Sequence, residues 1–229
     1  MNAISTRIKV VEERIARIAE TCGRRPTEIS LIAVSKSQTA EMVREALDAG
    51  QLLFGENRVQ ELIAKVPLLP SSIHWHFIGH LQKNKIRKVL PLVDLVHGVD
   101  SMELALEIDR IAAELGLFPR VLLEVNVSGE ATKFGFTPEE ARRDAPRLLA
   151  LPRVQWEGLM TIAPLVDAAD KARPFFAQLR ILRDQIAAEN QIALPTLSMG
   201  MSDDFEAAIE EGATLIRLGT AIFGARGKA

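Results

Sequence analysis

The sequence has no tyrosine and only one cysteine among its 229 residues. Because Cys22 stands alone, no disulfide can form within the chain, and we expect a reducing, cytoplasmic location. Without tyrosine, no phenol group is available in this chain as an acid or a base. No apolar run approaches the roughly 20 residues needed to cross a bilayer. The opening stretch, Met1 to Glu20, has the charge spacing of an amphipathic helix and not the apolar centre of a signal peptide.

Neither sign of charge dominates the composition, with 28 Lys and Arg against 30 Asp and Glu and a formal net charge of −2. Proteins that bind nucleic acid or anionic membranes through charge usually carry a basic excess, so we expect neither partner here. The basic residues near position 85 have no aromatic residues between them and are interpreted as a solvated helix face. No exposed apolar stripe is evident, and a monomer is expected.

Short apolar runs alternate with longer amphipathic stretches along the whole chain, which is treated as a single domain over residues 1–229. Several of the runs are rich in Val, Ile and Leu without strict alternation, as strands buried on both faces are. The eight runs are Ile29–Ser35, Leu52–Gly55, His74–Gly79, Leu95–Val99, Val121–Val127, Val154–Met160, Thr196–Met199 and Thr214–Leu218. This pattern predicts an α/β fold, a single modified TIM-type (β/α)8 barrel.

Little chain follows the last run, so we expect the additional N-terminal helix to fill the place of a full eighth helix. Helix starts are predicted at Thr137-Pro-Glu-Glu140 and, by a similar capping box, at Asp100-Ser-Met-Glu103. A doubly wound open sheet is the alternative architecture. No G-x-G-x-x-G follows any of the runs, which weakens the dinucleotide-binding form of that alternative.

Functional groups of a barrel gather where strands end and loops begin. Lys36 ends the almost wholly apolar run Ile29–Ser35. Apolar surroundings and a neighbouring cation favour the neutral amine, which is the form that attacks an aldehyde. A lysine that merely extends to solvent from a strand end is an equally good interpretation of this run taken alone.

A glycine-containing turn, Ser198-Met-Gly-Met-Ser202, follows the seventh run, and Gly219-Thr220 follows the eighth. Loops at these places hold phosphate in many TIM barrels, through backbone N–H groups and hydroxyls. Ser202 acting only as a helix cap remains an alternative. A phosphate site and a lysine amine at one barrel mouth match the two attachments of pyridoxal 5′-phosphate (PLP).

The chain resembles the PLP homeostasis proteins, relatives of the barrel domain of bacterial alanine racemase. The resemblance runs nearly from end to end, and its most specific blocks are Leu197–Asp204 and Ile216–Gly224. Further blocks are Ala33–Lys36, Phe54–Glu61, Trp75–Gln82 with Asn84-Lys85, and Gly158–Met160. It implies a PLP Schiff base on Lys36 and a carrier or buffer in intracellular PLP homeostasis, without catalytic turnover. PLP-dependent apoenzymes are then the expected recipients.

The resemblance also implies roles for individual residues. Phosphate contacts are expected from Ser198, Met199, Gly200, Ser202, Gly219 and Thr220. Arg217 matches the position whose guanidinium faces the pyridine nitrogen, where a permanent donor favours an unprotonated ring. Asn57 and His80 are expected to line the same mouth. Many relatives have Tyr in place of Arg58 and Pro in place of His80, so family roles do not transfer to those two positions.

Two other functions compete with the carrier. A PLP-dependent amino-acid racemase needs a second base opposite the lysine; in alanine racemases this is a tyrosine of a C-terminal domain, and this chain has neither. A metal-dependent hydrolase could use His74 and His76, but further histidines from later strands are missing, and no metal is expected. The role of Lys133, on the predicted rim after the fifth run, is left open.

Overall fold

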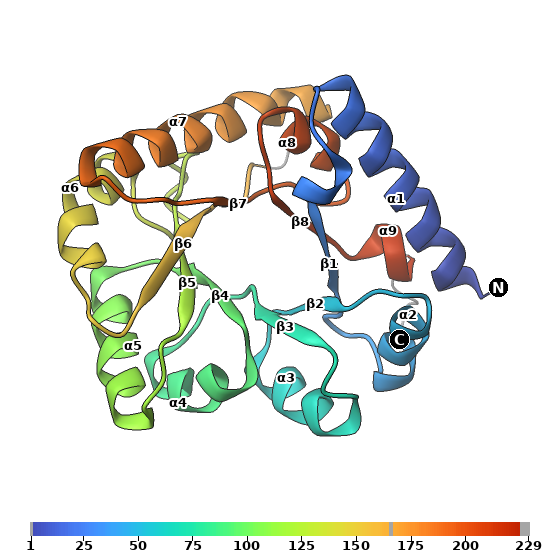
Figure 1. The fold of residues 1–229 in the computed structure, drawn as a ribbon, viewed down its shortest axis with the longest axis horizontal. Coiled ribbons are helices and arrows are strands. Elements are labelled where there is room, and N and C mark those ends of the chain that lie inside the picture. The colour runs from blue at the N-terminus through green and yellow to red at the C-terminus, as the bar shows by residue number, and fades with distance from the viewer. Residues whose placement is uncertain (1, 165–166, 225–229) are drawn as a thin grey trace.

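Eight parallel strands close into a barrel in which every strand pairs with its neighbours in sequence and β8 pairs with β1 (Figure 1). The structure, a computed structural model, describes residues 2–164 and 167–224. The strands are β1 Ser30–Val34, β2 Leu53–Glu56, β3 His74–Phe77, β4 Leu95–Val99, β5 Arg120–Glu124, β6 Gln155–Met160, β7 Thr196–Ser198 and β8 Leu215–Leu218. The predicted TIM-type barrel is therefore confirmed, and the open-sheet alternative is wrong because the sheet has no free edge.

Each of the eight apolar runs contains a strand, although the ends differ. The largest difference is at the fifth run, where β5 stops at Glu124 and not at Val127. Beyond Glu124 the chain also pairs with the later residue Phe136: Val125 bridges to Phe136, and the Asn126 N–H donates to the Phe136 carbonyl over 2.9 Å. The loop between them is thereby folded onto the rim of the barrel.

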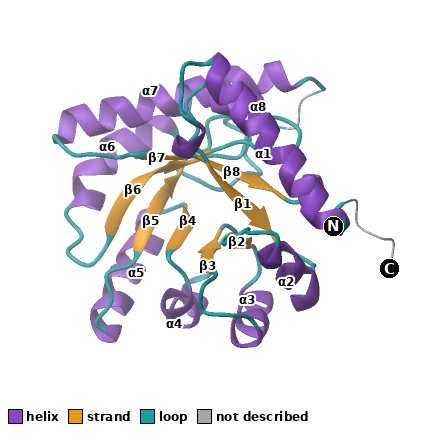
Figure 2. Ribbon diagram, turned by 45° about the vertical axis from the view of Figure 1, so that its right-hand side comes forward, coloured by secondary structure: helices purple, strands orange, loops and turns teal. Residues whose placement is uncertain are grey.

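Helices form a ring outside the strands (Figures 1 and 2). In the described residues they are α1 Ala3–Thr21, α2 Ala40–Asp48, α3 Val59–Lys65, α4 Ile86–Val89, α5 Met102–Leu115, α6 Pro138–Leu149, α7 Arg173–Asn190, α8 Phe205–Glu210 and α9 Thr220–Phe223, with short 3-10 turns between several of them. None of these helices has the length and apolar character needed to cross a bilayer.

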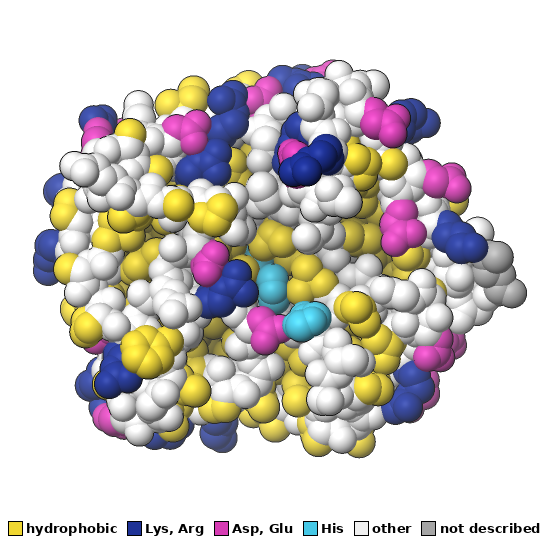
Figure 3. Space-filling model, in the orientation of Figure 1, with side chains coloured by type: hydrophobic (Ala, Val, Ile, Leu, Met, Phe, Trp, Pro, Cys, Tyr) yellow, Lys and Arg dark blue, Asp and Glu magenta, His cyan; other side chains and the backbone are white. Residues whose placement is uncertain are grey.

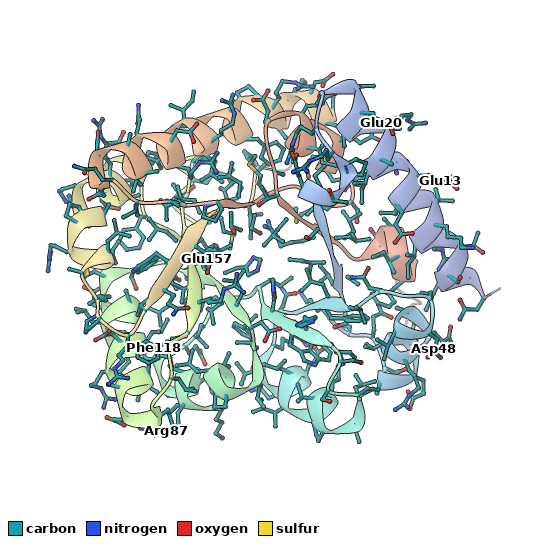
Figure 4. All side chains as sticks on the ribbon, in the orientation of Figure 1. Glu13, Glu20, Asp48, Arg87, Phe118 and Glu157 are labelled. Atoms are coloured by element: carbon teal, nitrogen blue, oxygen red, sulfur yellow. The ribbon has the colours of Figure 1, made fainter. Side chains whose placement is uncertain are left out.

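The N-terminal helix α1 occupies the gap in the ring, as expected. It lies against α2, α8 and the short α9. Its buried face repeats at helical spacing, through Ile4, Ile8, Val11, Ile15 and Ala19. On the opposite face, Glu13 and Glu20 point away from the barrel (Figure 4).

Helix starts were predicted with mixed success. At α6, Thr137 and Glu140 form the complete capping box. At α5 the predicted box is wrong: Ser101 and not Asp100 is the N-cap, and its side chain accepts from the Leu104 N–H. The Asp100 carboxylate instead lies 2.7 Å from His80 Nδ1.

Two kinds of residue fill the barrel interior. Side chains of successive strand residues point alternately outward to the helices and inward to the axis. The inward positions include a small apolar cluster of Ile32, Leu95, Leu122, Met160 and Leu215. Polar side chains also point inward toward the barrel axis, and those of His76, His97, Ser198 and Arg217 are all buried. A polar column inside the barrel is the feature that distinguishes this core.

Candidate cofactor site

The backbone on both sides of Lys36 is fixed by hydrogen bonds from outside its own loop. Lys65 donates to the Ser35 carbonyl over 2.7 Å. The Ser37 N–H donates to Glu61 Oε2 over 2.7 Å, and Ser37 itself has a positive φ of 63°. Non-glycine residues rarely adopt this conformation, so the turn after β1 is held by these contacts. They fix the direction in which Lys36 leaves the strand.

Behind that loop lies a buried ion pair. Lys65 Nζ is 2.6 Å from Glu56 Oε1 and 3.2 Å from Glu61 Oε2, and Glu56 is fully buried. The Ser35 hydroxyl donates to Glu56 Oε1 over 2.6 Å. Burial raises the pKa of Glu56, although the hydrogen bonds from Lys65 and Ser35 lower it. Through its hydrogen bond to the Ser35 carbonyl, the pair holds the backbone that precedes Lys36.

A cavity of about 260 Å³ lies at the carboxyl ends of the strands, at the place where the lysine emerges. Polar groups from both halves of the chain meet there: Lys36 after β1, Arg217 on β8, and Thr220 at the start of α9. The full lining is Val34, Lys36, Gln38, Asn57, Ile78, Ile162, Met201, Ser202, Asp203, Arg217, Gly219, Thr220 and Gly224.

Arg217 provides a buried cation in the cavity wall. Its guanidinium donates to the Ser198 hydroxyl and, over 2.8 Å, to the Thr161 carbonyl. Burial lowers the pKa of Arg217 to about 10, while the nearby carboxylates of Glu124 and Asp204 raise it. The side chain therefore stays protonated near neutral pH and offers only donors to the cavity.

The turn between β7 and α8 is built to hold backbone against the cavity. Gly200 has a φ of 92°, and a Cβ there would lie 2.6 Å from the Ala208 side chain, so a larger residue does not fit. The Asp204 carboxylate accepts from the Met201 N–H over 2.6 Å and ties the turn to the helix start. Within residues 2–164 and 167–224, no group accepts from the N–H groups of Ser202 and Asp203, both of which line the cavity.

Six of the ten residues predicted for the site line this cavity. They are Lys36, Asn57, Ser202, Arg217, Gly219 and Thr220. Ser198 and Met199 are fully buried behind it, and Gly200 contributes the turn and not a contact surface.

His80 lies outside the cavity lining. It borders an adjoining hollow of about 170 Å³, which shares Asn57 with the cavity. Its ring stacks on Phe134, with ring centroids 4.1 Å apart.

Several residues of the site were not anticipated from the sequence. Ile162 and Asp203 line the cavity, and Thr161 holds Arg217 through its carbonyl. Ile162 follows β6 directly, so the rule that barrel strands end at the site could have found it. Lys133 does come to this rim: its Nζ lies 3.1 Å from Glu130 and 3.5 Å from the Ile162 carbonyl.

The two histidines considered for a metal have different partners. His74 is exposed and its Nδ1 is 2.8 Å from Asp94. His76 is buried and its Nδ1 is 2.9 Å from His97 Nε2. Among the described residues, no group of three or more His, Cys, Asp or Glu has the arrangement of a metal site.

Comparison with known proteins places the chain in a family. The model of the family described as alanine racemase, N-terminal domain, matches residues 8–227, and the chain belongs to that family. Curated relatives similar to this chain over most of its length are named pyridoxal phosphate homeostasis proteins. The protein of that name from Aquifex aeolicus is 45% identical over 227 residues, covering 99% of both chains. The one from Escherichia coli is 40% identical over 236 residues, covering 99% of this chain and 98% of its own.

Solved structures agree with this placement. PipY of Synechococcus elongatus, solved with PLP bound, has 44% identity and a TM-score of 0.81 over 92% of this chain and all of its own. An alanine racemase of Clostridium difficile, 19% identical, has a TM-score of 0.72 over 94% of this chain but only 56% of its own. This second likeness concerns the fold alone.

Proposed function

We propose that this chain binds PLP through a Schiff base on Lys36 and acts as a carrier in intracellular PLP homeostasis, with no catalytic turnover. The observation that carries the proposal is that Lys36, Arg217 and Thr220 line one cavity, although they come from opposite ends of the sequence. An amine, a fixed guanidinium and a hydroxyl beside a tight glycine turn are the groups needed for the aldehyde, the ring nitrogen and the phosphate of PLP.

The donor set fits this cofactor in detail. Ser202 and Thr220 bring hydroxyls, and the Ser202 and Asp203 N–H groups have no acceptor within the described chain, so an anion can take these donors. Arg217, held by Ser198 and Thr161, can only donate, which suits an unprotonated pyridine nitrogen. PLP owes its reactivity to an aldehyde and a ring that withdraws electrons, and a ring kept unprotonated withdraws them less.

The absence of turnover is supported by the groups that line the cavity. Among residues 2–164 and 167–224, the titratable side chains of its lining are Lys36, Asp203 and Arg217, and we propose that the turn containing Asp203 holds the phosphate. Burial leaves the pKa of Arg217 at about 10, so it does not act as a base near neutral pH. Tyrosine is absent from the sequence. A racemase needs one base on each face of the reacting carbon, and Lys36 alone supplies one.

The proposed homeostasis role is supported by relatives that bear this name. They are 40–45% identical to this chain over nearly its whole length. We propose PLP-dependent apoenzymes as recipients, action as a monomer, and a cytoplasmic location compatible with a single, exposed cysteine. No nucleic-acid partner is proposed, because the charge is nearly balanced.

Spectroscopy of the purified protein tests the proposal. After loading with PLP and removal of excess, the protein is expected to be yellow, with the visible absorbance band of a Schiff base. Lys36→Arg keeps the positive charge but cannot form that bond, so the band should be lost. Retention of the band in this variant would refute the assignment to Lys36.

A further inference from the structure

A chain of hydrogen bonds runs through the barrel interior from the wall of the cofactor cavity toward the opposite end. Arg217 donates to the Ser198 hydroxyl; Ser198 Oγ lies 2.9 Å from His97 Nδ1; and His97 Nε2 lies 2.9 Å from His76 Nδ1. These residues belong to β8, β7, β4 and β3, and all are buried. Neither histidine lines the cofactor cavity or takes part in the proposed binding of PLP.

The hydrogen-bond partners determine which atom donates and which accepts at each of these contacts. Arginine only donates, so Ser198 Oγ is an acceptor toward Arg217 and has one hydrogen of its own to place. Within the described residues, His97 Nδ1 is the acceptor available to that hydrogen. His97 must then carry its proton on Nε2 and donate to His76 Nδ1. By the same argument His76 carries its proton on Nε2.

Burial disfavours the opposite donor order, in which His97 would donate from Nδ1 to Ser198. The Ser198 hydroxyl would then accept from both Arg217 and His97, and its own hydrogen would have no acceptor among the described residues. Leaving a buried donor unsatisfied costs about 1–3 kcal/mol. Both rings are also neutral: burial lowers the pKa of His76 to about 4, and burial, together with the nearby positive charge of Arg217, lowers the pKa of His97 well below its usual value.

The His76 end of this series of hydrogen bonds points toward the face where the strands begin. On that face His74 pairs with Asp94 and Arg120 pairs with Glu157, each over 2.8 Å. Figure 3 shows two histidine side chains beside acidic and basic ones near the centre of this face, and Figure 4 labels Glu157 there. The polar column thus extends from this side of the barrel interior to the wall of the cofactor cavity.

We propose that His97 and His76 are positioning residues of the cofactor site: their fixed donor order keeps the Ser198 hydroxyl as an acceptor and so holds the Arg217 guanidinium against the ring end of PLP. The inference rests on the proposed function, because it assigns Arg217 to the ring. It gives Ser198 a role behind the arginine, in place of a contact to the phosphate.

The tautomers can be measured without any ligand. In the full-length protein labelled with 15N-histidine, the ring nitrogen shifts of His76 and His97 are expected to report neutral rings protonated on Nε2. A proton on Nδ1 of either ring would overturn the proposed order. This result does not depend on PLP, so it separates the inference from the proposed function.

Ligand binding tests the positioning role. His97→Asn keeps an acceptor near the place of Nδ1, whereas His97→Phe removes it. We expect His97→Phe to weaken PLP and unphosphorylated pyridoxal alike, about tenfold, as the loss of one buried hydrogen bond does. It should also move the 15N shift of the pyridine nitrogen in labelled PLP, and His97→Asn should restore part of both effects.

The exposed His74→Asn is the matched control and should bind as the wild type does. If folded His97→Phe binds both ligands with wild-type affinity and leaves the pyridine shift in place, the positioning role is wrong. If His97→Phe does not fold, His97→Asn takes its place: weaker binding of both ligands than in wild type, with a moved pyridine shift, supports the role, and wild-type affinity with an unmoved pyridine shift contradicts it.

Discussion

Lys65 donates a 2.7 Å hydrogen bond to the carbonyl oxygen of Ser35, the residue that precedes Lys36. The same ammonium group forms a buried ion pair with Glu56. A lysine that does not line the cavity therefore holds the backbone from which the cavity lysine extends. Removing one partner of a buried pair costs more than the pair contributes, because the other charge stays buried without compensation.

Replacing Lys65 should lower the stability of the folded protein. We expect Lys65→Met to lower the free energy of unfolding by about 3–5 kcal/mol, measured by urea denaturation. Adding Glu56→Gln should recover part of that loss by removing the orphaned charge. Lys171→Met, which breaks an exposed pair with Asp167, should change stability by about 0–1 kcal/mol. Equal losses in the two single variants would contradict the role given to Lys65.

The phosphate end of the cavity can be tested by comparing two ligands. Thr220→Val and Ser202→Ala each remove a hydroxyl that lines the cavity. A hydrogen bond to a charged group contributes about 1.5–3 kcal/mol, so PLP binding should weaken about tenfold or more. Pyridoxal, which has no phosphate, should bind nearly as before. Thr132→Val, in the exposed loop after β5, is the control. Equal weakening of both ligands would show that these hydroxyls support the fold and not the phosphate.

Burial of His76 predicts a loss of stability in mild acid. Its pKa falls from 6.5 to about 4 because burial disfavours the charged ring. A group with a lowered folded pKa contributes stability above pH 6.5, and this is lost as the pH falls toward 4, up to about 3 kcal/mol. In urea denaturation between pH 7.5 and 4.5, His76→Gln should show a shallower loss than wild type. A wild-type slope in His76→Gln would refute the assignment.

The sequence was sufficient for the barrel because the signal is spread over many residues. Eight buried strands and the helical spacing of α1 each repeat a pattern that local chemistry dictates. Lys36, Ser202, Arg217 and Thr220 could be placed for the same reason, since a parallel barrel brings all strand ends to one face.

What sequence could not supply was the partner of each polar side chain. The family resemblance implies a phosphate contact for Ser198, but nothing in the sequence predicts that its side chain points inward and accepts from Arg217. Lys65 and Glu56 are separated by nine positions on two elements, and nothing in their spacing predicts a buried pair. Inward or outward direction on a strand depends on register, which shifts by one residue at irregularities such as that between β5 and β6.

The proposed absence of turnover should be visible in proton exchange. Lys36 is the one base of the cavity lining in the part of the chain that the structure describes, and the proposed site keeps the ring unprotonated. The PLP-loaded protein should therefore leave the α-hydrogen of alanine and other amino acids in place in deuterated buffer. Deuterium incorporation and chiral analysis measure this, with PLP-treated Lys36→Arg as the background control. Exchange or racemisation at about 1 per second or faster, an ordinary enzymatic rate, would mean that the chain is an enzyme.

Chemical trapping tests the central claim most directly. Borohydride reduction of the PLP-loaded wild-type protein, followed by proteolysis and mass spectrometry, identifies the lysine that carries the cofactor. We expect a pyridoxyl phosphate label on the peptide that contains Lys36, and its loss in Lys36→Arg. A label confined to Lys65, Lys133 or any other lysine, or no label at all, would contradict it.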